Sequence, residues 1–154
     1  MPACTFFGDS KCTSSVYPCL AAVIEELVAT ERISTFYVGD NGNFDKLVQK
    51  ALSEASKNHP EIKCFIVLAY LPGEKKEYVP SPLLETIYPE GIEKTPLRFA
   101  INRRNQWILS RSDFVVVYSS PFGNSRKIAE KAFISEKNII DLSDEMKNLF
   151  PFRS

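Results

Sequence analysis

Three short segments carry the glycine and polar residues that are best suited to bind a small anion. They are Gly8-Asp9-Ser10, Gly39-Asp40-Asn41-Gly42-Asn43 and Gly123-Asn124-Ser125. Glycine lets the backbone approach a ligand closely, and the amides at the start of a helix attract negative charge. Strand-to-helix turns favour the same residue types for their own geometry. Each segment taken alone therefore fits either a phosphate cradle or an ordinary turn.

An arginine-rich stretch at residues 98–111 is the second candidate anion-binding feature. It contains Arg98, Arg103, Arg104 and Arg111. A guanidinium group holds a phosphate or a carboxylate in a forked geometry, although arginines on a surface helix are commonly just solvated. Arg103 and Arg104 point about 100° apart on a helix, so we expect only one of them to face a ligand.

The elements that must position these residues alternate along the chain. Apolar, β-prone runs predict five strands, at residues 4–8, 33–38, 63–71, 114–118 and 138–142. Helical spacing of apolar residues predicts helices at residues 17–32, 44–55, 97–112 and 124–136. This alternation predicts a Rossmann-like α/β fold, in which helices cover both faces of a mainly parallel five-stranded sheet. The expected strand order is 3-2-1-4-5.

Two helices and one long connection lead to more specific predictions. The strongest apolar stripe on a helix consists of Phe44, Leu47, Val48, Ala51, Leu52 and Ala55. The arginine-rich helix should turn another set toward the body of the protein, namely Ile101, Asn105, Ile108 and Leu109. Residues 72–96 hold five prolines and many charges, which predicts a surface excursion with a lid or dimer-contact role.

In an open parallel sheet, ligands bind outside the carboxyl ends of the strands, where the strand order reverses. The three glycine-containing segments follow strands and should meet at that edge. We therefore expect them to form one small-molecule site, with an arginine of the helix beside it. Glu130 would face this site only if the helix at residues 124–136 begins at the same edge.

Composition narrows the class of protein. The 154 residues fit a single domain spanning 1–154. Lysine plus arginine equals aspartate plus glutamate, at 19 each, which argues against extensive nucleic-acid binding. No apolar run approaches the roughly 20 residues of a membrane span, and no signal peptide is recognisable. These features predict a cytoplasmic protein that does not contact a membrane.

The cysteines and the single histidine do not suggest a metal centre. The four cysteines form no Cys-x-x-Cys pair, and His59 is far from them in sequence. We predict no metal and no cofactor, and we expect Cys4 and Cys64 to be reduced and buried as small apolar residues.

The three segments and their order resemble the SLOG superfamily, which includes the LOG-type cytokinin-activating phosphoribohydrolases and the DprA proteins. The resemblance runs from Cys4 to Leu142 through "CTFFGDS", "FYVGDNGNFD" and "NRRNQWILSRSDFVVVY". The likeness is greatest to small uncharacterised bacterial and phage-associated members, through "TFFG", "TFYVG", "VLAYLPG" and "PEGIE". It implies a Rossmann-like fold, a nucleotide or nucleotide-derived ligand and a homodimer.

The resemblance also assigns individual residues. Arg104 takes the position of the enzymes' arginine, and Asp113 takes that of the aspartate before the fourth strand. The enzymes carry Pro-Gly-Gly-x-Gly-Thr-x-x-Glu after that strand, where this chain reads "SSPFGNSRKIAE" and keeps Gly123 and, at an altered spacing, Glu130. Asn105 stands in the place of the enzymes' lysine. Ligand binding by a sensor or sequestering domain is therefore the leading hypothesis.

Two alternatives remain at this point. The first is a LOG-type N-glycosidase acting on a nucleoside 5′-monophosphate, with Glu130 and Arg104 as catalytic residues and Asp9 or Asp45 as other candidate carboxylates. The second is an interaction domain that has lost its ligand. The ligand itself could be a mononucleotide, a cyclic nucleotide or an ADP-ribose derivative.

Overall fold

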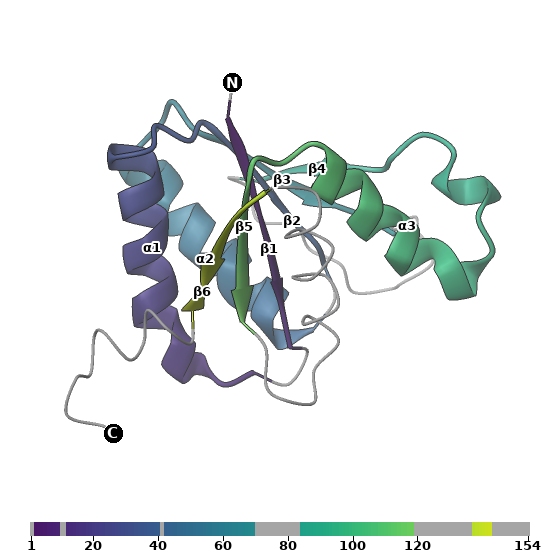
Figure 1. Ribbon diagram of the computed structural model, residues 1–154, viewed down its shortest axis with the longest axis horizontal. Coiled ribbons are helices and arrows are strands. Elements are labelled where there is room, and N and C mark those ends of the chain that lie inside the picture. Colours follow the sequence, from purple (N-terminus) through teal and green to yellow (C-terminus); the bar gives the residue numbers. More distant parts are fainter. Residues whose placement is uncertain (1, 10–11, 41, 70–83, 119–136, 143–154) are drawn as a thin grey trace.

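A single parallel sheet organises the chain (Figure 1). The computed structural model describes residues 2–9, 12–40, 42–69, 84–118 and 137–142. Six strands pair in the order β4-β3-β2-β1-β5-β6, and every pairing is parallel. The strands are β1 (Ala3–Gly8), β2 (Thr35–Val38), β3 (Lys63–Val67), β4 (Glu85–Ile87), β5 (Phe114–Tyr118) and β6 (Asn138–Asp141). The predicted α/β class and the relative order of the five predicted strands are confirmed.

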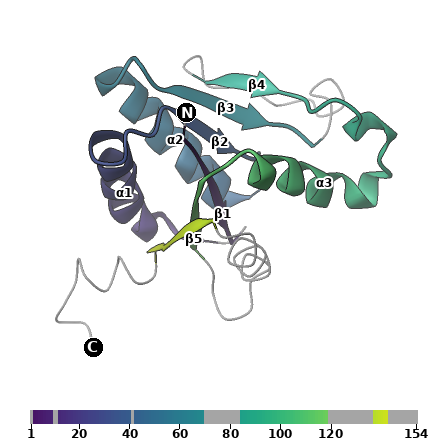
Figure 2. The same cartoon turned by 45° about the horizontal axis from the view of Figure 1, so that its top comes forward.

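The sixth strand, β4, lies inside the segment 72–96 that the sequence predicted to be a surface excursion (Figure 2). It pairs with the end of β3, and Leu84 and Ile92 beside it are buried. The second half of this segment therefore belongs to the sheet and its core. A strand of three residues gives no detectable periodicity, which explains why the pattern missed it. The predicted lid depends mainly on residues 70–83, which lie outside the described residues.

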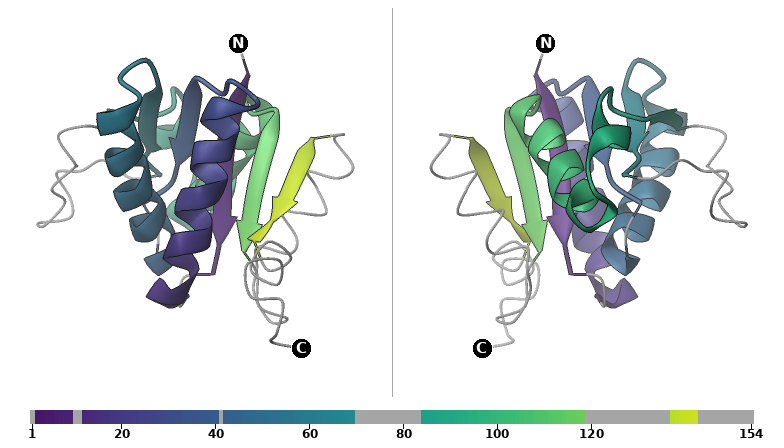
Figure 3. Two further views of the ribbon diagram at one scale, coloured as in Figure 1. Left: turned by 90° about the vertical axis from the view of Figure 1, so that its left-hand side faces the viewer. Right: turned by 90° about the vertical axis from the view of Figure 1, so that its right-hand side faces the viewer.

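Helices cover both faces of the sheet (Figure 3). On one face lie α1 (Tyr17–Ala29) and α2 (Asn43–Asn58), and on the other lies α3 (Leu97–Ser110). Short 3-10 turns, η1 (Ser14–Val16) and η3 (Ile92–Lys94), precede α1 and α3. Pro18 in the first turn of α1 is compatible with the helix because the first amides lack intrahelical partners. The helix predicted at residues 124–136 lies outside the described residues.

The larger core lies between the sheet and the pair α1 and α2. Phe6 and Phe36 stack in it with their ring centroids 6.0 Å apart, against fully buried Leu20 and Ile24. The predicted apolar stripe of α2 points into this core, with Leu47 only partly buried. Each large apolar side chain buried in this way contributes about 1.5–3 kcal/mol.

On the opposite face, α3 turns an unexpected stripe toward the sheet. Its buried residues are Ala100, Arg104 and Ile108, which follow each other at intervals of four. The predicted face was right for Ile108 and for Leu109, which packs against the core while partly buried. It missed Ala100 and Arg104, and Ile101 and Asn105 are only partly buried. Ranking residues by hydrophobicity puts arginine on the surface, whereas here a buried arginine occupies the centre of the stripe.

The amino-terminal edge of the sheet is joined through Asp113. Its Oδ2 accepts a hydrogen bond from the Ala3 amide at 3.0 Å, and its own amide donates to the Ala3 carbonyl at 2.8 Å. Its carbonyl accepts a bond from the Asn138 amide at 3.0 Å. Asp113 therefore connects β1, β5 and β6 at the edge opposite to the predicted ligand site.

The four cysteines are free thiols buried in the protein. Burial raises the pKa of Cys4, Cys12 and Cys64, which disfavours the reactive thiolate. The prediction that Cys4 and Cys64 act as small buried residues is confirmed. Within the described parts of the chain, no helix is long and apolar enough to cross a membrane.

His59 follows the last residue of α2 and connects this helix to α1. Its Nε2 lies 2.8 Å from Glu25 Oε2 on α1, and its Nδ1 lies 3.5 Å from Glu61 Oε1. The hydrogen bond with Glu25, followed by the charges of both carboxylates, raises the pKa of His59 above its ordinary value of 6.5.

This raised pKa predicts a pH-dependent stability. A pKa that is higher in the folded than in the unfolded protein stabilises the fold fully below about pH 6.5, and this stabilisation is lost as the pH rises through the raised value. Chemical denaturation across this range should show that wild type loses stability relative to His59→Gln as the pH rises. A constant difference between the two proteins would contradict the assignment.

Candidate functional site

The loop from β2 to α2 forms the centre of the predicted ligand edge. Gly39 and Asp40 follow the last residue of β2, and Gly42 stands immediately before α2. Gly42 has φ of 96° and ψ of 178°, a backbone conformation that residues with a Cβ rarely adopt. This glycine is therefore required for the conformation of the turn.

Gly39 is a glycine for a different reason, because its φ lies outside the left-handed region. A Cβ at this position would come within 2.8 Å of Asp45 Oδ2 and within 3.0 Å of both Cζ and Nη1 of Arg104. The space beside Gly39 is therefore filled by the protein's own side chains. Other atoms do approach the Gly39 backbone closely, but in this structure they belong to the side chains of Asp45 and Arg104.

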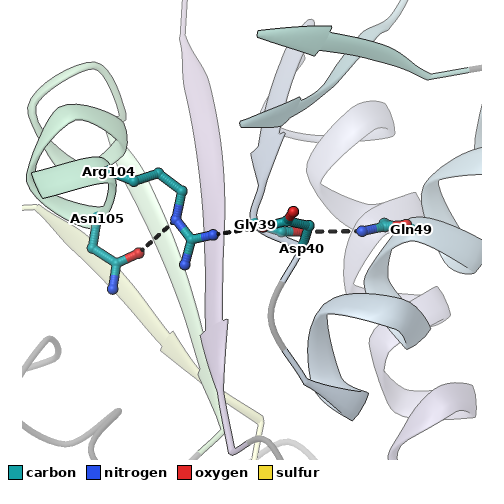
Figure 4. Close-up of polar contacts among 5 residues, drawn as sticks. All are labelled: Gly39, Asp40, Gln49, Arg104 and Asn105. Carbon is teal, nitrogen blue, oxygen red and sulfur yellow. Dashed lines mark hydrogen bonds and ion pairs between the residues drawn. The ribbon is translucent and has the colours of Figure 1, made fainter. Parts of the chain in front are cut away.

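Arg104 extends from α3 to this loop (Figure 4). Only 3% of the residue is exposed. Its Nη1 donates a hydrogen bond to Asp40 Oδ1 at 3.0 Å, and its Nε donates to Asn105 Oδ1 at 3.2 Å. A buried guanidinium needs such partners, because an unpaired buried charge is strongly destabilising.

Gln49 holds the same loop from the other side. Its Nε2, on α2, donates a hydrogen bond to the Gly39 carbonyl at 3.0 Å. Sequence reasoning missed Gln49, although a usable signal was present. Gln49 follows Asp45 by four residues and so shares a face of α2 with a residue at the predicted edge.

Asp45 is the second buried charged residue of the site, with 7% of its surface exposed. It lies in the first turn of α2, where the positive end of the helix dipole favours a carboxylate. Burial raises the pKa of Cys12, and the charges of Asp9 and Asp45 raise it further. Both carboxylates therefore act on this thiol near the end of β1.

Gly8 makes room for an aromatic ring. A Cβ on Gly8 would overlap the ring of Phe44 in the first turn of α2. Phe44 in turn stacks on Tyr118 at the end of β5, with the centroids 6.2 Å apart. The Asp9 amide donates to the Tyr118 carbonyl at 3.2 Å, which joins the segment that follows β1 to the end of β5.

The structure places several predicted site residues at the carboxyl edge of the sheet, namely Gly8, Asp9, Gly39, Asp40, Gly42 and Asn43. Arg104 is bonded to Asp40 and lies beside Gly39. Arg103 is exposed on α3, and Arg98 is exposed with its Cζ 4.8 Å from the Phe99 ring centroid. Neither forms a hydrogen bond with the described residues of these loops. The others lie outside the described residues, namely Ser10, Asn41, Gly123, Asn124, Ser125 and Glu130.

Within the described ranges, no group of three histidine, cysteine or acidic side chains is arranged to hold a metal ion. Comparison with protein-family models and with curated proteins returns no match to this chain. The geometry of the site indicates its chemistry. That geometry is a buried guanidinium beside a helix N-terminus, with three carboxylates, Asp9, Asp40 and Asp45, at the same edge.

The contact between Gly8 and Phe44 leads to a prediction about stability. Gly8→Ala should destabilise the protein by about 1–3 kcal/mol, the range for overpacking of a well-packed core. Phe44→Leu should relieve the overlap, so that Gly8→Ala costs less in the double variant than alone. Urea denaturation of the four proteins gives the coupling energy.

Gly91→Ala is the matched control for this cycle. Gly91 has φ of 87°, and a Cβ at this position would meet no atom within 4 Å beyond its chain neighbours, so its substitution strains only the backbone. Its cost should be the same with Phe44 or Leu at position 44. Additive effects of Gly8→Ala and Phe44→Leu would show that the ring does not require this glycine.

Proposed function

We propose that this chain binds a nucleotide or nucleotide-derived small molecule, whose anionic group contacts Arg104 at the carboxyl edge of the sheet. The observation that carries the proposal is the burial of Arg104, which is 3% exposed on the face that α3 turns to the sheet. Replacing a buried ion pair by apolar side chains is often neutral or stabilising. A buried charge at this position is therefore better explained by ligand binding than by stability.

The donors of the guanidinium support the same proposal. The hydrogen bonds of Arg104 to other described residues use Nε and Nη1. A guanidinium has five N–H donors, and Nη2 donates to no acceptor among the described residues, so it could donate to a ligand oxygen. The first-turn amides of α2 add positive partial charge to the same edge, since Gly42 provides no side-chain cap.

The fold supports this type of ligand. Parallel sheets bind nucleotides at their carboxyl ends, and the six strands are all parallel. The motifs that resemble the SLOG superfamily include the Gly39–Asn43 loop and Arg104, and both contribute to the edge described above. We infer that a sensor or sequestering domain is the form that this function takes.

Neighbouring arginines on α3 provide the test. Arg104→Gln should weaken nucleotide binding by about 1.5–3 kcal/mol, the range for a hydrogen bond to a charged group. Arg103→Gln removes the same charge from an exposed position and should change the affinity by less than about 0.5 kcal/mol. Calorimetry with ligands identified by mass spectrometry of the purified protein is the measurement. Equal affinities of the two variants would contradict the proposed contact.

A second candidate function is hydrolysis of the N-glycosidic bond of a nucleoside 5′-monophosphate. The buried carboxylate of Asp45 favours it, because it borders Gly39 together with the Arg104 guanidinium. A carboxylate could stabilise the oxocarbenium-like centre of such a reaction while arginine holds the phosphate. Glu130, the other candidate, lies outside the described residues.

We predict that bound nucleotide is recovered chemically unchanged. A misplacement of about 1 Å can lower a rate by roughly a hundredfold, and the spacing of Glu130 differs from that of the enzymes. Chromatography after incubation with purine and pyrimidine nucleoside monophosphates should show no free base. Base release that is lost in Glu130→Gln or in Asp45→Asn, with folding intact, would establish the hydrolase instead.

A further inference from the structure

The ion pair between Arg104 and Asp40 is open to solvent on one side. The Arg104 side chain is 4% exposed, whereas that of Asp40 is 16% exposed. A molecule that approaches from solvent therefore reaches the pair from the side of the carboxylate. Gln49 holds the adjacent Gly39 carbonyl, so the loop backbone has an anchor that does not involve Asp40.

Asp40 and Asp45 differ in what holds them. Asp45 is buried in the first turn of α2, where the helix dipole stabilises its charge. Asp40 precedes the helix, and within the described part of the chain its carboxylate is bonded to Arg104. The Asp40 side chain is 16% exposed and lies outside the buried core, whereas Asp45 is part of the buried start of α2.

From this arrangement we propose that the Asp40 carboxylate occupies the position on Arg104 that the anionic group of a ligand takes, so that a ligand binds by displacing it. The inference rests on the proposed function and adds an internal competitor to it. A carboxylate and a phosphate accept the same charge-assisted hydrogen bonds from a guanidinium. The bound and unbound forms then both leave the buried charge of Arg104 paired.

Internal competition lowers the apparent affinity by the fraction of molecules in which Arg104 is available. An anion must provide better hydrogen bonds or more charge than Asp40 to bind. The opposite role is also physically reasonable, because Asp40 could instead orient Arg104 toward the ligand. The two roles make opposite predictions when the charge of Asp40 is removed.

The decisive variant is Asp40→Asn, which keeps the shape of the side chain and an oxygen that can accept from Nη1. With inorganic phosphate as the probe, calorimetry at neutral pH and low ionic strength should show binding about ten- to a hundredfold tighter than in wild type. Adding Arg104→Gln should remove this gain. Asp40→Ser, with a smaller polar side chain, should shift the affinity in the same direction.

Glu54→Gln is the matched control for net charge. Glu54 lies on α2 with 57% of its side chain exposed, and it pairs with Lys57. Phosphate affinity should be unchanged in this variant. A similar gain in both Glu54→Gln and Asp40→Asn would assign the effect to overall charge and overturn the inference. Thermal unfolding of each variant confirms that the folded protein is being measured.

Two negative outcomes distinguish this inference from the function on which it rests. In the first, wild type binds phosphate, and folded Asp40→Asn and Asp40→Ser bind it equally or more weakly. This outcome overturns internal competition and makes Asp40 a positioning residue. Absence of phosphate and nucleotide binding in wild type and in both Asp40 variants overturns the anion site together with the inference.

Discussion

A guanidinium with 3% of its residue exposed has to be neutralised inside the protein, and three elements are arranged around this requirement. The loop after β2 supplies Asp40 as the ion-pair partner, and α3 supplies Arg104. Gly39 provides the space in which the guanidinium lies, because a Cβ there would come within 3.0 Å of it. Gln49 from α2 fixes the same glycine through its carbonyl. This ion pair thus adds a polar contact to the apolar packing of Ile108 and Trp107, by which α3 lies on the sheet.

The other glycine of the edge follows the same logic with an apolar partner. Phe44 lies against Gly8 and stacks on Tyr118, so the start of α2 is held against the ends of β1 and β5. Both glycines allow close contacts within the protein. Glycines at the carboxyl edge of the sheet therefore shape this edge by admitting other side chains, which are Phe44 beside Gly8 and Asp45 and Arg104 beside Gly39.

Local patterns predicted the fold where they were long enough to be read. The alternation of five apolar runs with helical stripes predicted a doubly wound sheet, whose default strand order is the one observed, and the stripe of α2 predicted part of the larger core. The sequence pattern did not reveal β4, because a strand of three residues is too short to show a periodicity. The face of α3 was misjudged because its central position holds a charge, whose burial becomes favourable only when Asp40 lies opposite it. Such a pairing joins residues 64 positions apart and is invisible to any local window.

The position of β1 in the sheet has a consequence for synthesis of the chain. β1 pairs on one side with β2, which follows it closely, and on the other with β5, and the bond from Ala3 to Asp113 spans 110 residues. While the chain emerges from the ribosome, the backbone edge that β1 offers to β5 has no native partner until the second half is made. An open strand edge of this kind is a template for pairing with other chains. Pairing of β5 with β1 is thus the step that covers this edge, and nascent chains are exposed to misassembly until it occurs.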